Sequence, residues 1–188
     1  MKSEATSSLK IPVAISACLL GEPVRYDGGD KFNPQLIARL RQHFVLVAIC
    51  PEVAIGMGVP RPPIQLVQDA AGVRACGVQN PSHDITDLLA NYGHDVAITQ
   101  PELGGYVLKA RSPSCGLGST PLFDINGHLI GKTNGVYTGA ILVALKTLPM
   151  ADEEQLRVDA SFQEFVKNVT DYYVRRRGNR LRGRNSEN

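Results

Sequence analysis

The sequence predicts a single three-layer α/β domain around a mostly parallel sheet, with two small hairpins and a basic C-terminal tail. Short, continuous apolar runs are typical of strands buried on both faces of a parallel sheet, and segments with helical spacing separate them. The length of 188 residues fits a single domain of common size. We expect the domain to span residues 11–174, between a polar arm at 1–10 and an Arg-rich, disordered tail at 175–188.

Three apolar runs have the length of strands: IPVAISA at 11–17, FVLVAI at 44–49 and YVLKA at 106–110. Two hairpins are also expected. The first flanks Asp69-Ala70-Ala71-Gly72, and the second flanks the turn Asn126-Gly127, a dipeptide that favours a tight hairpin turn.

Four helices are expected. Asn33 and Pro34 occupy the positions of an N-cap and a first helical residue, before apolar residues at helical spacing. Further helical patterns cover 84–100, where Gly93 interrupts the pattern, and 136–145. The last helix has one apolar stripe, formed by Phe162, Phe165, Val166, Val169, Tyr172 and Tyr173.

The composition excludes several classes of protein. Hydrophobic residues at 43% and charged residues at 20% are ordinary for a folded globular chain and exclude wholesale disorder. No apolar run approaches the roughly 20 residues of a membrane span. The opening residues MKSEATSSLK lack the apolar stretch of a signal peptide. We therefore expect a cytoplasmic protein without membrane contact.

The net charge of +2 conceals an asymmetry along the chain. Residues 175–188 contain six arginines and one acid, whereas the rest of the chain has 14 basic and 17 acidic residues. The six are Arg175, Arg176, Arg177, Arg180, Arg182 and Arg184. Such a cluster can bind a phosphate backbone, for example that of tRNA. The alternative is a solvated end without a partner.

Three of the four cysteines follow strands. Cys18 and Cys50 come directly after the first two apolar runs, and Cys115 follows the third after four more residues. Because ligands bind at the carboxyl ends of the strands in an open parallel sheet, these thiols can converge on one site. Cys76 lies inside a hairpin strand and is expected to be a small buried apolar residue.

The cysteine spacing bears on the metal that such a site would hold. A structural zinc site normally has four ligands at short local spacings, whereas these cysteines are 32 and 65 residues apart. Three thiolates with one vacant position suit either a catalytic zinc with a bound water or an iron–sulfur cluster. The spacing alone does not choose between the two.

Four motifs together resemble one family. They are CLLGEPVRYDG at 18–28, CPE at 50–52, PRPP at 60–63 and KARSPSCG at 109–116. In combination and order they are similar to the bacterial family known as domain of unknown function 523, which includes the thiouracil desulfidases. The resemblance covers about residues 12–150 and leaves the basic tail outside.

The resemblance implies a cofactor and catalytic residues. It implies a [4Fe-4S] cluster held by Cys18, Cys50 and Cys115, with the fourth iron open to the sulfur of a thiocarbonyl substrate. The family's catalytic acid–base residue falls on Glu52 and its catalytic serine on Ser112. Water activated by Glu52 would attack the ring carbon.

Four other polar residues are candidates for binding substrate. Arg25, Asp27 and Lys31 follow the first cysteine, and Arg61 follows the second. They would either orient the substrate or tether the Pro- and Gly-rich loops through ion pairs.

The expected function is therefore removal of sulfur from a small thiolated pyrimidine, 2- or 4-thiouracil, by a [4Fe-4S]-dependent enzyme. One alternative keeps the chemistry and changes the substrate to thiouridine in tRNA, bound through the Arg-rich tail. A non-enzymatic metal-binding or redox-sensing protein and a zinc hydrolase are further alternatives.

Overall fold

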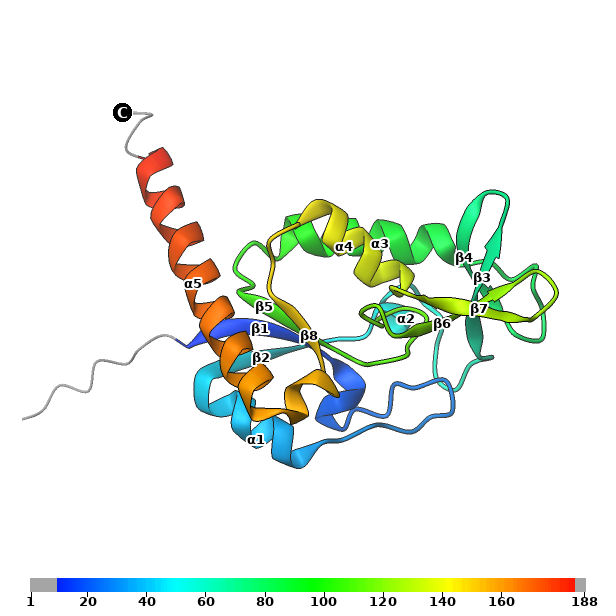
Figure 1. Cartoon of the computed structure of the whole chain (residues 1–188), viewed down its shortest axis with the longest axis horizontal. Helices are drawn as coiled ribbons and strands as arrows, with labels where there is room; N and C mark the ends of the chain where they lie inside the picture. Colours follow the sequence, from blue (N-terminus) through cyan, green and yellow to red (C-terminus); the bar gives the residue numbers. More distant parts are fainter. Residues whose placement is uncertain (1–9, 185–188) are drawn as a thin grey trace, which may run out of the picture.

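A four-stranded parallel sheet in the order β2-β1-β5-β8 lies at the centre of the computed structural model, which describes residues 10–184 (Figure 1). Its strands are β1 (Ile11–Ser16), β2 (Phe44–Ile49), β5 (Gly105–Leu108) and β8 (Met150–Asp152). The three predicted strands are confirmed. The sequence did not indicate β8, whose three residues pair in parallel with β5.

Helices cover both faces of this sheet. On one face lie α1 (Pro34–His43) and α5 (Asp159–Arg184), and on the other lie α3 (Thr86–Thr99) and α4 (Val136–Ala144) (Figure 1). Successive side chains of β1 point to opposite faces of the sheet and so contact both helical layers. Val13 and Ile15 pack with α1 and α5, while Ala14 packs with α3 and α4. The predicted three-layer α/β arrangement is confirmed.

Local chemistry explains where α1 begins and how closely α3 and α4 pack. The Asn33 side chain accepts a hydrogen bond from the Leu36 amide at 3.2 Å, so the predicted cap of α1 is present. Gly93 does not end α3. A Cβ atom there would lie 2.8 Å from both the Ala140 Cβ and the Tyr137 carbonyl oxygen, so glycine allows α3 and α4 to approach closely.

The two predicted hairpins combine into a second sheet in the order β4-β3-β6-β7. They consist of β3 (Ile64–Asp69) with β4 (Gly72–Gly77) and β6 (Thr120–Asp124) with β7 (Leu129–Thr133). Both hairpins are antiparallel, as expected, and β3 pairs with β6 in parallel. That pairing joins segments far apart in the sequence, so no local pattern predicted it.

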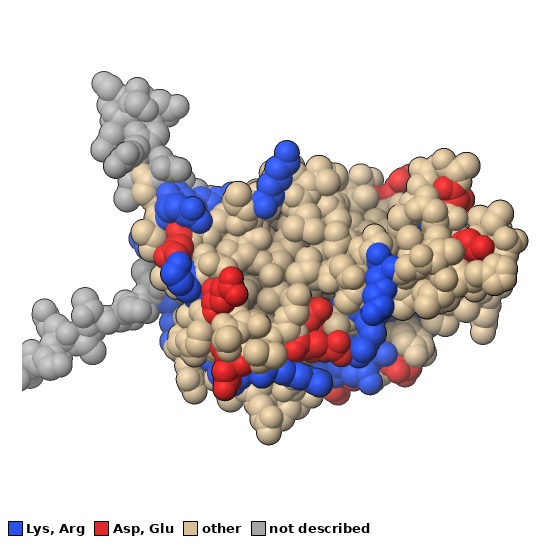
Figure 2. Space-filling view, in the orientation of Figure 1, with Lys and Arg blue, Asp and Glu red and all other residues tan. Residues whose placement is uncertain are grey.

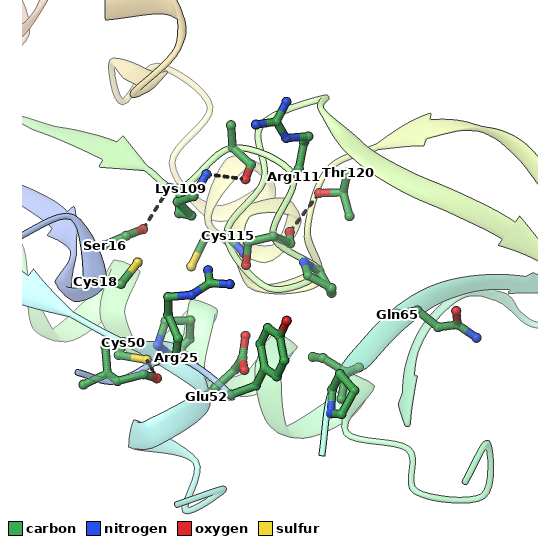
Figure 3. A pocket seen from close by; sticks show the side chains of 18 of the residues that line it. Ser16, Cys18, Arg25, Cys50, Glu52, Gln65, Lys109, Arg111, Cys115 and Thr120 are labelled. Atoms are coloured by element: carbon green, nitrogen blue, oxygen red, sulfur yellow. Dashed lines mark hydrogen bonds between the residues drawn. The ribbon is translucent and has the colours of Figure 1, made fainter. Parts of the chain in front are cut away.

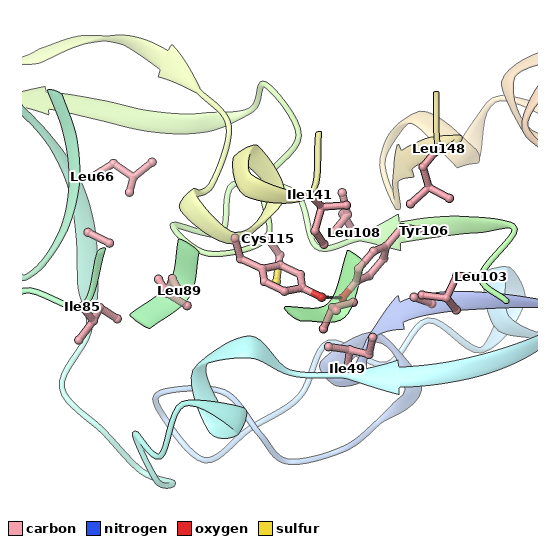
Figure 4. Packing of buried hydrophobic residues seen from close by; sticks show 14 of the residues in the cluster. Ile49, Leu66, Ile85, Leu89, Leu103, Tyr106, Leu108, Cys115, Ile141 and Leu148 are labelled. Carbon is pink, nitrogen blue, oxygen red and sulfur yellow. Dashed lines mark hydrogen bonds between the residues drawn. The ribbon is translucent and has the colours of Figure 1, made fainter. Parts of the chain in front are cut away.

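One apolar cluster connects the two sheets (Figure 4). Leu66 from the second sheet, Leu89 from α3 and Tyr106 from the first sheet are fully buried in it. The Tyr106 hydroxyl donates to the Tyr137 hydroxyl at 3.2 Å, which satisfies a polar group inside the core. The cluster fixes the relative position of the sheets, and the cavity described below is lined by residues of both.

The C-terminal helix differs from the expectation at its end. The predicted apolar stripe is largely buried, with Phe162, Phe165, Val169 and Tyr172 in the core. However, α5 continues to Arg184. The prediction of a disordered tail is therefore wrong for residues 175–184. Arginine is a good helix former, and Arg176 donates to the Tyr172 hydroxyl one turn back at 2.6 Å.

The remaining parts of the predicted arm and tail, residues 1–9 and 185–188, lie outside the described residues. Figure 2 shows basic and acidic side chains interspersed along α5, and few charged side chains over α3 and α4 on the same face. Within residues 10–184, no helix is both long and apolar enough to cross a membrane.

Candidate active site

A cavity of about 340 Å³ lies at the carboxyl ends of β1, β2 and β5 (Figure 3). Cys18, Cys50 and Cys115 all line it, as the strand-end argument predicts. Cys76 is buried in β4 and is not among the described residues that line the cavity. The fold thus separates three cysteines from the fourth in the way that the sequence indicated.

Each of the three cysteines reaches the cavity from a different turn after a strand. Cys18 lies in a short 3₁₀ helix, η1 (Ala17–Leu20), that follows β1 directly. Cys50 is the N-cap residue of the single-turn helix α2 (Pro51–Ala54), which follows β2. Cys115 lies in the loop between β5 and β6, packed against the start of α4, where the Thr138 hydroxyl donates to the Cys115 carbonyl oxygen at 2.9 Å.

Cys18 and Cys115 are buried, Cys50 is partly buried, and the three thiols interact electrostatically. Burial, together with the neighbouring Cys50, raises the pKa of Cys18 to about 11, while Arg25 and Lys109 act in the opposite direction. Burial also raises the pKa of Cys50. The pKa of Cys115 is well above its ordinary value for the same reason, although a hydrogen bond with Ser16 opposes the shift. Thiolates at these positions therefore need a bound cation to stabilise them.

The Cys115 loop is held in shape by the hydroxyl group of Ser112. The Ser112 Oγ accepts hydrogen bonds from the amides of Ser114 and Cys115 at 3.3 and 3.1 Å. The Ser112 carbonyl oxygen accepts from the Thr120 hydroxyl at 2.8 Å. Arg111, just before the loop, has a φ of 59°, which is uncommon for a residue with a side chain. Ser112 lines the cavity, and its hydroxyl hydrogen is not used in either of these two contacts.

Glu52, in the first turn of α2, lines the same cavity and is bonded through both of its oxygens. Its Oε2 accepts from the Arg61 Nε at 2.7 Å, and its Oε1 accepts from the Ser114 hydroxyl at 2.8 Å. Arg61 also donates to the carbonyl oxygens of Gly58 and Val24, each at 2.8 Å. The carboxylate is therefore fixed by two side chains, one nine residues along the chain and one 62 residues away.

The four candidates for binding substrate have different positions. Arg25 and Arg61 line the cavity, although Arg61 uses its guanidinium to hold Glu52 and two loop carbonyls. Asp27 and Lys31 are not among the described residues that line it. Asp27 is exposed, and the Gly29 amide and Arg25 lower its pKa. Lys31 borders a separate surface cleft at the start of α1. These two side chains therefore lie outside the cavity, because the loop turns away after Tyr26, and the ion pair of Asp27 with Arg25 agrees with the tethering alternative.

The sequence reasoning gave no role to Lys109, Ser16 and Glu153. Lys109 lines the cavity, forms a buried ion pair with Glu153 and donates to the Ala110 carbonyl oxygen at 2.9 Å. The Lys109 amide donates to the Ser16 hydroxyl at 3.0 Å, which ties β5 to β1. Lys109 is the first residue of the motif KARSPSCG, so the motif could have indicated it as a residue of the site. Glu153 follows β8, a strand too short to predict.

Comparison with known proteins agrees with this geometry. The family model of 2-thiouracil desulfurase matches residues 13–153, most of the chain. A solved structure of the [4Fe-4S]-dependent thiouracil desulfidase TudS superposes with a TM-score of 0.60 at 30% identity, over 79% of this chain and 94% of that one. Comparison with curated protein sequences gave no significant match. With three cysteines and Glu52 around one cavity, the chain belongs to the 2-thiouracil desulfurase family.

Proposed function

We propose that this chain is a [4Fe-4S]-dependent desulfidase, which replaces the thiocarbonyl sulfur of a thiolated pyrimidine with oxygen. The observation that carries the proposal is that Cys18, Cys50 and Cys115, from three strand ends, line one cavity together with Glu52. The structural likeness to TudS, described as a [4Fe-4S]-dependent thiouracil desulfidase, supports it.

The residues present fit an iron–sulfur cluster. Two buried thiols and one partly buried thiol supply soft ligands, and Arg25 and Lys109 supply positive charge close to Cys18. Within residues 10–184, no three His, Cys, Asp or Glu side chains are arranged to hold a single metal ion. A bound cluster with three protein thiolates would supply an open iron that polarises the thiocarbonyl bond.

The cavity suits a small planar substrate. Its volume of about 340 Å³ lies near the lower end of the roughly 300–1,000 Å³ found for small-molecule pockets. Figure 3 shows Gln65 of the second sheet across the cavity from the three cysteines, and Phe123 of the same sheet also lines the cavity. An apolar ring and an amide are suitable partners for the face and the polar edge of a pyrimidine. We assign the base to this side of the cavity.

Glu52 and Ser112 would handle the protons of the reaction. Arg61 and Ser114 each occupy one lone pair of the Glu52 carboxylate, so each oxygen retains a second lone pair that can accept a proton from water. That water would attack the carbon that carries sulfur. The Ser112 hydroxyl is free to donate to the ring or to the oxygen that is added. Oxygen from water replaces sulfur, which leaves as sulfide, so no net electron transfer is needed.

An anaerobic experiment tests the proposal. Protein reconstituted with iron and sulfide is analysed for both elements, then incubated with 2-thiouracil or 4-thiouracil while uracil and sulfide are measured. We expect about four irons per chain and equal amounts of uracil and sulfide. Zinc at one ion per chain would overturn the cluster assignment, and a full cluster without turnover would favour the redox-sensing alternative.

The tRNA alternative rests on a different part of the molecule. Arg175 and Arg177 are exposed on α5, next to the partly buried Arg176. A helix with clustered arginines can contact a phosphate backbone, although it does not identify the nucleic acid. A tRNA that contains 4-thiouridine is therefore included as a third substrate, and turnover of this tRNA alone would support the alternative.

A further inference from the structure

Arg25 carries a buried donor without an acceptor. Its Nε is shielded from solvent, and no hydrogen-bond partner for it exists among the described residues. The side chain lines the cavity, and Figure 3 shows the guanidinium directed toward the space between Cys18 and Cys115. A buried N–H group without an acceptor destabilises the fold, and more so when it is charged. The position therefore calls for an acceptor that the protein does not supply.

The neighbouring side chains hold Arg25 in place without satisfying the Nε. The Asp27 Oδ1 lies 3.5 Å from the Arg25 Nε, as an ion pair rather than a hydrogen bond, and accepts from the Gly29 amide at 3.0 Å. The Tyr26 ring centre is 5.3 Å from the Arg25 Cζ, a favourable distance for a cation over a ring. The loop that contains Arg25 is closed by the Gly28 amide, which donates to the Arg25 carbonyl oxygen at 3.0 Å. The loop thus fixes the guanidinium in the cavity wall.

The groups beside the guanidinium are thiols. Arg25 and Cys18 line the same cavity, so the positive charge of the guanidinium lies beside the cysteine sulfur atoms (Figure 3). A set of thiolates and sulfides carries negative charge and accepts hydrogen bonds, and such hydrogen bonds raise the reduction potential of a cluster. The cavity therefore offers sulfur atoms as the acceptor once the cluster is present.

We propose that the Arg25 Nε–H donates to a sulfur atom of the group that Cys18, Cys50 and Cys115 hold, and that its charge offsets the negative charge of this group. Arg25 is then a positioning residue for the cofactor rather than a ligand of the substrate. This inference rests on the proposed function, since it needs the cluster to form.

The test compares Arg25→Lys and Arg25→Met with the native chain after anaerobic reconstitution. Lysine keeps the positive charge but places a methylene group where arginine has Nε, and methionine removes both the charge and the donor. Iron and sulfide content and the midpoint potential of the cluster, followed by EPR during a redox titration, are measured on each. Arg41→Met, which removes an exposed arginine at the end of α1, controls for loss of a charge elsewhere.

We expect the potential to fall in Arg25→Lys and further in Arg25→Met, while Arg41→Met keeps the native value. A native potential in Arg25→Met with full iron content would overturn the proposal. If Arg25→Met loses its cluster, the lysine variant decides: a lowered potential supports donation by Nε, and a native potential overturns it. Absence of a cluster from the native chain would instead contradict the proposed function itself.

Discussion

Arg61 and Glu52 form a buried ion pair in the wall of the cavity, with 2.7 Å between Nε and Oε2. Only 3% of the Arg61 side chain and 14% of the Glu52 side chain are exposed. The pair joins α2 to the loop before β3, and the Arg61 guanidinium also bonds two carbonyl oxygens. A carboxylate fixed in this way is oriented before any substrate arrives, which is what positioned proton transfer requires.

Removing one partner of this pair should destabilise the fold. We expect Arg61→Gln to lower the free energy of unfolding by about 3–5 kcal/mol, because it leaves a buried carboxylate without its charge partner. Urea denaturation measures the change. Lys167→Gln is the matched control, since it removes an exposed ion pair with Asp171 and should cost at most about 1 kcal/mol. Equal losses of unfolding free energy in the two variants would contradict the argument that a buried ion pair matters more for stability than an exposed one.

Glu52→Gln should separate cluster assembly from catalysis. Glutamine keeps the size of the side chain but loses the basic site, so iron content should remain native while turnover falls about 10²-fold or more. Iron content, substrate binding and single-turnover rate are measured on the same anaerobic sample. Native turnover would exclude Glu52 from the mechanism, and loss of iron would make it a structural residue.

The position of the cavity could be predicted from the sequence because it follows from the order and direction of the strands. Apolar runs predicted the strands, and the ends of parallel strands meet at one edge, so three distant cysteines were expected there. The same reasoning failed for Lys31, which lies only six residues beyond Arg25 yet borders another cleft. A turn in which Gly28 has a φ of 77° separates the two side chains, and its direction depends on the packed loop.

The hydrogen-bond partners of Glu52 could not be predicted from the sequence, for a different reason. Ser114 is 62 positions from Glu52 in the chain. Arg61 follows Glu52 after a loop whose path cannot be predicted from a periodic sequence pattern. Contacts of this kind depend on how the two sheets are placed, and that placement depends on the apolar cluster between them, whose residues come from distant parts of the chain. The motifs indicated which segments carry the site, whereas tertiary structure determined which side chains touch.

The four cysteines provide an internal comparison. We expect serine at position 18, 50 or 115 to abolish cluster binding, because each of these cysteines lines the cavity, whereas Cys76→Ser should retain the native iron content. Iron and sulfide analysis after anaerobic reconstitution gives the answer. A full cluster in any of the first three variants would remove that cysteine from the set of ligands.

Deletion of residues 175–188 tests whether the arginines of α5 serve a nucleic acid. Among the residues of α5 whose burial is described, up to position 178, the last buried one is Tyr172, so the domain should remain folded. If the arginines contact phosphates, binding of tRNA should weaken and depend less steeply on salt, because fewer counterions are released. Turnover of a free thiolated base should not change. An unaltered salt dependence would indicate that the arginines are merely solvated.

The start of α4 supports the Cys115 loop through a close contact at Gly135. A Cβ atom at this position would lie 2.3 Å from the Ser114 carbonyl oxygen and 2.8 Å from the Cys115 amide nitrogen. Both are backbone atoms, so the added methyl group cannot be accommodated by rotation of a side chain. The Gly135 amide also donates to the Gly116 carbonyl oxygen at 2.8 Å, which any displacement of the loop would weaken.

We therefore expect Gly135→Ala to reduce both stability and iron content. Overpacking of this kind typically costs about 1–3 kcal/mol, and moving the loop displaces one of the three thiols. Gly139→Ala is the matched control in the same helix, since nothing lies within 4 Å of the added Cβ. It should stabilise the protein by up to about 1 kcal/mol, because alanine favours the helix over glycine. Urea denaturation and iron analysis of both variants decide the matter. A native iron content in a destabilised Gly135→Ala protein would show that the thiol reaches the cluster without this contact.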